Sequence, residues 1–96
     1  MEIKVVEIKL VHGDKPLKAL VAIEVGGIII RDIRVVKENG RRPVVLAPQN
    51  SWKGDDGQIR YRTVVTFPDE VKGEIDFVVL KRYIGELEKC NADSTR

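Results

Sequence analysis

The side chains of this chain that could do chemistry are mainly arginines and lysines in its middle third. Residues 31–62 carry eight basic and four acidic residues, whereas residues 1–30 are balanced and residues 63–96 carry five basic against seven acidic. A guanidinium is a planar fork that binds phosphate through two hydrogen bonds and also stacks on bases. The pattern therefore favours nucleic acid, although charges on the outer face of a sheet are also typical of a solvated surface. The middle set is Arg31, Arg34, Arg41, Arg42, Lys53, Arg60 and Arg62.

Two aromatic residues lie among these cations. Trp52 precedes Lys53 in the polar stretch 49–57, which we interpret as an exposed loop. An aromatic residue in such a loop docks onto the body, joins an interface or stacks on a base, and of these we expect docking. Tyr61 lies between Arg60 and Arg62, so strand alternation places it on the opposite face, where we expect it in the core with Ile59.

Residues for catalysis or metal binding are few. His12 is the one histidine and Cys90 the one cysteine, so a nucleophile paired with a base is not expected. Asp55-Asp56 are adjacent carboxylates between glycines, which a turn explains better than a metal site. Gly26-Gly27 lacks the following helix that a phosphate-binding loop requires. We expect no enzyme activity, no metal, no cofactor and no small-molecule substrate.

Length and composition limit the class of protein. With 96 residues the chain should form one domain, expected over residues 1–90, followed by a flexible polar tail at 91–96. A lone cysteine excludes an internal disulfide, and the N-terminal residues lack the apolar region of a signal peptide. No apolar run approaches the roughly 20 residues that a membrane helix needs. We predict a cytoplasmic protein with no membrane association.

Alternation of apolar and polar residues predicts five strands, over residues 3–11, 17–25, 28–36, 43–47 and 58–67. A phase slip at Val5-Val6 indicates a bulge in the first strand. Gly26-Gly27 suits a two-residue hairpin turn, because both glycines tolerate positive φ. Asn39-Gly40 indicates a second turn, and Pro48 ends the fourth strand.

After Pro68 the apolar period changes from 2 to 3.6, which predicts one amphipathic helix. Asp69 is a candidate N-cap, and Lys89 suits the negative end of the helix dipole. The fold class is therefore α+β, an antiparallel β-sheet of about five strands followed by a C-terminal α-helix packed on it. The apolar stripe of the predicted helix comprises Val71, Ile75, Val79, Tyr83 and Leu87, joined by Val78, Leu80 and Ile84.

So short a sheet leaves an edge strand unpaired, which favours a homodimer formed through sheet edges. The edge-to-edge contact would also add core to a chain of limited size. We therefore expect a second copy of the chain as a partner.

The stretch 29–48 reads IIRDIRVVKENGRRPVVLAP. Its order of Asp32-Ile33-Arg34-Val35, a glycine turn, a short apolar strand closed by Ala47-Pro48 and a polar loop resembles the stage V sporulation protein G (SpoVG) family. The likeness extends over residues 17–83. It implies a small cytoplasmic bacterial protein that pairs as a dimer through its sheets and is linked to septation and sporulation. It also implies binding of DNA, and in some members RNA, through the C-terminal helix and nearby basic residues, here Lys72, Lys81 and Arg82.

Together these patterns predict a homodimeric regulator that binds nucleic acid mainly through backbone phosphates. The alternative is a dimeric protein-interaction module of the division machinery whose affinity for nucleic acid is incidental. Only phosphate binding should depend steeply on salt, so the two hypotheses differ in a measurable quantity. The expected phosphate contacts are Arg41, Arg42, Arg60, Arg62, Lys72, Lys81 and Arg82, with Trp52 as a stacking group.

Overall fold

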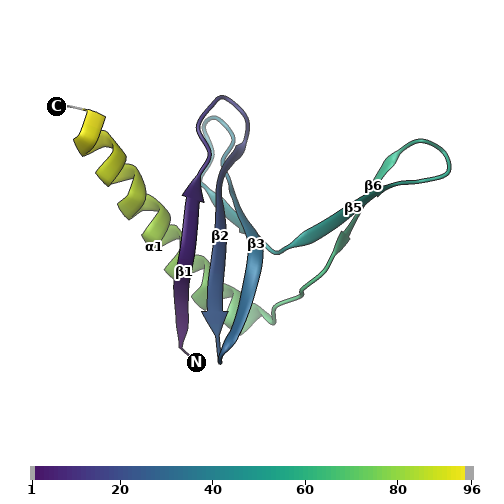
Figure 1. Ribbon diagram of the computed structural model, residues 1–96, viewed down its shortest axis with the longest axis horizontal. Helices are drawn as coiled ribbons and strands as arrows, with labels where there is room; N and C mark the ends of the chain where they lie inside the picture. Colours follow the sequence, from purple (N-terminus) through teal and green to yellow (C-terminus); the bar gives the residue numbers. More distant parts are fainter. Residues whose placement is uncertain (1, 95–96) are drawn as a thin grey trace.

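The computed structural model describes residues 2–94 and has an α+β fold with two antiparallel sheets followed by one helix (Figure 1). The predicted fold class is confirmed. The larger sheet has the strand order β1-β2-β3-β4, and the smaller sheet pairs β5 with β6. The elements are β1 (Ile3–Leu10), β2 (Leu17–Val25), β3 (Ile28–Val36), β4 (Val44–Leu46), β5 (Gln49–Lys53), β6 (Ile59–Thr63) and α1 (Asp69–Ser94).

The core lies between the four-stranded sheet and α1, which crosses one face of that sheet (Figure 1). Apolar residues at alternate positions of β2 and β3 face the helix, as period-2 burial requires. On α1 the middle of the predicted stripe is buried, whereas Ile84 and Leu87 are 49% and 37% exposed. The buried cluster is Ala19, Val21, Ile23, Ile33, Val35, Val45, Ile75, Val79 and Tyr83.

Both ends of α1 differ from the prediction. The Lys72 N–H donates to the Pro68 carbonyl at 2.8 Å, so Pro68 has the capping position and the prediction of Asp69 as N-cap is wrong. Asp69 instead lies in the first turn, where its charge favours the positive end of the dipole. The helix continues to Ser94, so Lys89 is not in its last turn and residues 91–94 extend the helix. Residues 95–96 and the Cys90 side chain lie outside the described part.

The predicted turns and bulge of the large sheet are confirmed. Gly26 and Gly27 have φ of 57° and 84°, which matches a tight hairpin between β2 and β3. The register of β1 shifts between Val5 and Glu7, where the bulge was predicted. A further bulge sets two residues of β3 against one of β2, and there Asp32 has a φ of 64°, a conformation that aspartate tolerates better than branched residues.

The prediction of a loop at 49–57 is wrong, because residues 49–53 form β5 and pair with β6. We call residues 49–63 the arm. It projects from the β3 side of the sheet (Figure 1), and every residue of both its strands is exposed. Tyr61 is 65% exposed and Trp52 is 46% exposed, so the predictions of a core position for Tyr61 and of docking for Trp52 are also wrong. The arm has no core of its own for an aromatic ring to enter.

No helix within the described residues has the length and apolar character needed to cross a membrane. The helix α1 instead alternates buried apolar residues with charged ones, which suits packing on a sheet.

Tyr83 makes the folded protein sensitive to high pH. Tyr83 is 4% exposed, and this burial raises the pKa of its phenol above its usual value of 10.0. When folding raises the pKa of a group, its contribution to the free energy of unfolding is fully present below the pKa of the unfolded state. That contribution is lost as the pH rises through the pKa of the folded state. We expect the Tm of the wild type to fall more steeply above about pH 10 than that of Tyr83→Phe.

The measurement is thermal unfolding followed by circular dichroism from pH 8 to pH 11.5. The difference in Tm between wild type and Tyr83→Phe at pH 8 is the reference, because the phenol is protonated there in both the folded and the unfolded state. Parallel Tm curves for wild type and Tyr83→Phe would contradict the prediction.

Candidate nucleic-acid interface

The register of the arm places three of the predicted site residues on one face. Trp52 pairs with Arg60, and Asn50 pairs with Arg62. Residues directly opposite each other in an antiparallel pair point to the same side, and the next pair along points to the other. Trp52, Arg60, Arg62 and Asn50 therefore share one side of the arm, which we call the cationic face. The other side, which we call the tyrosine face, carries Gln49, Ser51, Lys53, Ile59, Tyr61 and Thr63.

Arg60 is held in place by the turn of the arm. Its Nη2 lies 3.0 Å from Asp56 Oδ2, while Asp56 Oδ1 accepts the N–H of Gln58 at 3.1 Å. Gly54 leaves room for this arrangement, because a Cβ at Gly54 would lie 2.7 Å from Arg60 Nε. Asp56 thus serves the turn, as predicted for the Asp55-Asp56 pair. It also compensates part of the charge on Arg60.

Arg62 is the arginine of the cationic face whose positive charge has less compensation from acidic neighbours. Among the described residues it has neither an ion pair nor a side-chain hydrogen bond, and its strand is exposed throughout. Trp52, on the same face, leaves 46% of its surface exposed. A flat indole beside guanidinium groups can stack a base and bind the adjoining phosphate, which is the composition of single-strand binding surfaces.

Arg41 and Arg42 form a second exposed set, in the turn between β3 and β4. The Arg41 N–H donates to the Glu38 carbonyl at 3.0 Å, and Arg41 Nε lies 3.8 Å from a Glu38 carboxylate oxygen. Arg42 has no ion pair within the part of the chain that the structure describes. This turn is separated from the arm by β4, so it is a distinct patch and not an extension of the cationic face (Figure 1).

Lys72 has a structural position between the two layers. Its Nζ donates to the Val45 carbonyl at 3.0 Å and pairs with Asp76 one turn further along α1. The side chain is 33% exposed. This contact ties the first turns of the helix to β4, so the ammonium group is already engaged in the fold.

The other two predicted helix residues also have partners. Arg82 Nε lies 2.9 Å from Glu86 Oε1, and this hydrogen bond, together with Lys89 at 3.6 Å, lowers the pKa of the Glu86 carboxyl. Lys81 Nζ lies 5.9 Å from the centre of the Phe77 ring, within the range of a cation–π contact. The structure therefore brings Trp52, Arg60 and Arg62 together but leaves the helix cations as a separate set.

We predict that Lys72→Met destabilises the fold and leaves affinity for nucleic acid unchanged. The substitution leaves the Val45 carbonyl and the Asp76 carboxylate without this donor, and a charged hydrogen bond of this kind contributes about 1.5–3 kcal/mol. Since Lys72 is one-third exposed, about 1 kcal/mol is the expected loss in urea unfolding. Lys81→Met is the control and should change stability by less than about 0.5 kcal/mol. A Lys72→Met protein of unchanged stability that binds DNA poorly would place Lys72 in the interface.

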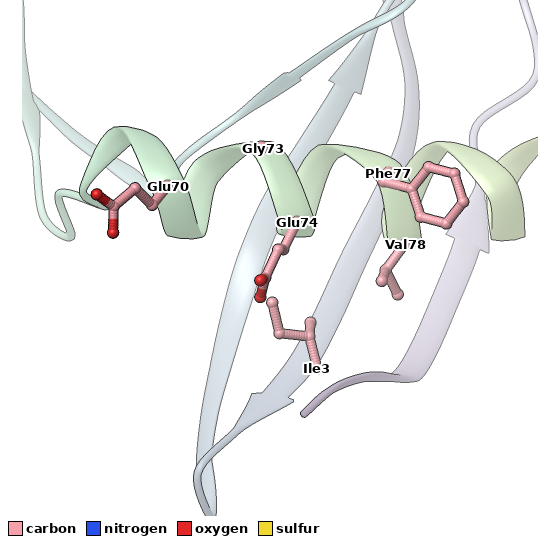
Figure 2. A pocket seen from close by; sticks show the side chains of 6 residues that line it. All are labelled: Ile3, Glu70, Gly73, Glu74, Phe77 and Val78. Carbon is pink, nitrogen blue, oxygen red and sulfur yellow. The ribbon is translucent and has the colours of Figure 1, made fainter. Parts of the chain in front are cut away.

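A groove beside α1 has the wrong charge for phosphate. Figure 2 shows Ile3, Phe77 and Val78 gathered along it, with the carboxylates of Glu70 and Glu74 on the same side. The groove has a volume of about 570 Å³, and Phe77 is 68% exposed. Carboxylates repel phosphate, so this surface is not part of the candidate interface.

Asn50 is a member of the cationic face that was not among the residues predicted for the site. The polar composition of residues 49–53 concealed a strand, and only a strand gives Asn50 a defined side. The glycine-flanked turn at 54–57 is the sequence feature that could have indicated this strand. In the structure Gly57 has a φ of 81°, and the Gly54 N–H donates to the Gln58 carbonyl at 2.8 Å. A turn of this kind between Trp52 and Ile59 is typical of a hairpin.

Comparison with known proteins assigns no function to the arm or to the rest of the chain. No protein-family model matches the sequence, and no curated protein matches it.

Proposed function

We propose that this chain is a non-enzymatic regulator that binds DNA and RNA as a homodimer, with the cationic face of the arm as its principal contact. The observation that carries the proposal is the placement of Trp52, Arg60 and Arg62 on one exposed side of a projecting hairpin. Stacking on an aromatic ring and pairing with phosphate both tolerate any base sequence. We therefore expect limited sequence preference. The resemblance to the SpoVG family supports the same function and a role in septation or sporulation.

The arrangement of charge supports binding on the arm in preference to the helix. The arm carries its cations away from the acidic first turns of α1, where Glu70 and Glu74 line the groove in Figure 2. Further along the helix, Arg82 and Lys89 already pair with Glu86. The turn with Arg41 and Arg42 is a second exposed basic patch on each copy. A nucleic acid longer than one arm would reach such additional phosphate contacts.

The test is a fluorescence-anisotropy titration of single-stranded DNA, duplex DNA and RNA at several salt concentrations. If a dimer neutralises on the order of 4 to 6 phosphates, log K for duplex DNA should fall with log salt at a slope of roughly −3 to −5. Absence of binding at low salt, or binding that ignores salt, would overturn the proposal. Either result would favour the protein-interaction module, for which the exposed Phe77 beside the groove is the supporting observation.

A further inference from the structure

The groove beside α1 continues from the part drawn in Figure 2 towards the far end of the helix. A second cavity, of about 640 Å³, shares Ile3, Phe77 and Val78 with the first, so the two cavities form one groove between β1 and α1. Lining residues extend along the helix from Glu70 to Lys89. This stretch of helix rises about 28 Å, which is the length of an extended segment of about eight residues.

The groove reaches round the open edge of β1. This strand pairs with β2 on one side, and no other strand within the described residues lies on its other side. Ile3 and Lys4 are neighbours in β1 and so point to opposite faces of the sheet, yet both line the groove. The backbone that joins them therefore borders the groove as well. An open edge offers N–H and C=O groups to an added strand, and this is a recurring way of binding an extended peptide.

Phe77 provides an uncovered apolar surface in the middle of the groove. It is 68% exposed, whereas Ile75, two residues earlier on α1, is completely buried. Ile3 and Val78 lie on the same side of the helix, and both are half-buried (Figure 2). In strand addition, pockets of this kind receive alternate side chains of the added strand and give the contact its specificity.

Two glycines of α1, Gly73 and Gly85, line the groove without a role in the packing of the chain itself. Glycine is one of the least favourable residues for a helix interior. A Cβ at either position would meet no atom within 4 Å, and neither glycine is among the residues with positive φ. Neither the backbone conformation nor a close contact inside the fold therefore requires a glycine. Both keep the groove open, so that the backbone of a bound segment can approach the helix.

The charge of the groove changes sign along its length. Glu70 and Glu74 lie at its first end, and neither has an ion pair within the part of the chain that the structure describes. The second end has one acidic residue, Glu86, against four basic ones, which are Lys4, Lys81, Arg82 and Lys89. A complementary segment needs acidic residues at the second end and basic residues at the first.

This order of charges excludes the other occupants that the molecule suggests. Nucleic acid carries negative charge throughout, so Glu70 and Glu74 repel it. The exposed strands of a second copy's arm, Gln49–Lys53 and Ile59–Thr63, contain no acidic residue and do not match the basic end. A segment of a different protein has neither limitation.

The direction of β1 determines the direction of the bound segment. Ile3 lines both parts of the groove and Val5 lines only the second part, so β1 runs towards the basic end. Antiparallel pairs of strands outnumber parallel pairs two- to threefold. An antiparallel segment begins at the basic end of the groove and finishes at the acidic end. Its acidic residues therefore come first in its sequence.

We propose that the groove binds an extended segment of a partner protein, which adds to β1 as an antiparallel strand. The segment carries acidic residues first, then apolar residues at alternate positions that cover Phe77, and then basic residues. The groove shares no residue with the arm, so this binding is independent of the proposed function.

The first test is a fluorescence-anisotropy titration with a labelled nine-residue peptide. The peptide has two glutamates, then valine and threonine alternating over five positions, then two lysines. It should bind at least about tenfold more tightly than the peptide with lysines first and glutamates last. Lys81→Glu should remove this preference, whereas Lys15→Glu, the same charge change in the loop before β2, should keep it. Equal affinity for the two peptides, or no binding up to about 1 mM, would overturn the proposal.

A second test fills the groove without weakening the fold. Gly85→Leu should bind the peptide at least about tenfold more weakly, because the new side chain occupies the space of the bound segment. Its Tm should not fall, since leucine favours a helix more than glycine does. Glu88→Leu places the same side chain on an exposed position of α1 outside the groove and should still bind the peptide. Unchanged affinity in Gly85→Leu would contradict the proposal.

A third test asks whether the backbone of the peptide pairs with β1. Successive N–H groups of a strand point to opposite edges, so methylation of alternate nitrogens removes the donors of one edge only. Of the two peptides methylated in this way, one should lose at least about tenfold in affinity and the other should still bind. Equal affinity of both would mean that no strand is added to β1.

The remaining outcomes separate this proposal from the proposed function. Without peptide, wild type and Gly85→Leu should have the same mass in sedimentation, because a difference would mean that a second copy occupies the groove. Gly85→Leu should keep the affinity of the wild type for DNA, and a parallel loss would make the groove part of the nucleic-acid interface. A protein that binds the peptide but neither DNA nor RNA would remove the proposed function and keep the groove as a peptide site.

Discussion

Trp52→Ala/Arg62→Ala should bind single-stranded DNA about 100-fold more weakly than the wild type. Stacking of one base on an aromatic side chain contributes about 1–3 kcal/mol, and a hydrogen bond to a charged group contributes about 1.5–3 kcal/mol. Exposure of both side chains places each contribution near the low end of its range, and their sum is close to 3 kcal/mol. Anisotropy titration at about 50 mM salt measures the change.

The two substitutions should differ in their effect on the salt slope. Arg62→Ala removes one phosphate contact per arm and therefore two per dimer, so the slope of log K against log salt on duplex DNA should become shallower by about 2. Trp52→Ala removes stacking and should lower affinity while leaving the slope unchanged. An equal change of slope in both single variants would contradict the assignment of separate roles.

A substitution at Asp56 should raise the affinity for nucleic acid, whereas the substitutions at Trp52 and Arg62 should lower it. Because Asp56 compensates Arg60, Arg60→Ala should weaken binding less than Arg62→Ala does. Asp56→Asn keeps an oxygen for the Gln58 N–H but removes the negative charge, so it should strengthen binding. Lys9→Ala, on β1 and away from the arm, is the control. If it weakens binding as much as Arg62→Ala, the arm is not the interface.

The strands of the large sheet and the helix could be predicted because each buries an apolar side. Burial requires apolar residues at every second position of β2 and β3 and at a period near 3.6 on α1. Both periods can be recognised in the sequence. The arm buries nothing, so no such pattern marks β5. Its strands are specified by the turn at 54–57 and by the residues that pair across it. The same absence of burial explains why Tyr61 was expected in a core that the arm does not have.

Part of the candidate site was predictable and part was not. Strand alternation alone places Arg60 and Arg62 on one side, as predicted. The addition of Trp52 to that side required the register of the hairpin, which depends on the length of its turn. The resemblance to the SpoVG family implied Lys72 as a nucleic-acid contact, and the sequence does not show that the Val45 carbonyl lies beside its ammonium group. A tertiary hydrogen bond of this kind shows which basic side chains stabilise the fold and which remain available to bind phosphate.

Ile75→Ala should destabilise the protein by about 2–5 kcal/mol, the usual range for truncation of a buried isoleucine. Ile75 is 0% exposed and belongs to the central cluster with Ile23, Ile33 and Val79. Because domains are stable by only about 5–15 kcal/mol, this loss removes a large share of the free energy of unfolding. Urea unfolding at one fixed protein concentration measures the loss and keeps any contribution from dimer formation constant.

Phe77→Ala is the matched control for this experiment, since Phe77 lies two residues further along the same helix but is 68% exposed. It removes a larger side chain than Ile75→Ala does, yet it leaves no internal cavity and should change stability by less than about 1 kcal/mol. Comparable losses in the two variants would mean that a partner covers Phe77 in solution. That result would indicate an interface on the outer side of α1. A large loss for Ile75→Ala alone places the folding core between α1 and the four-stranded sheet, where Ile75 packs with Ile23, Ile33 and Val79.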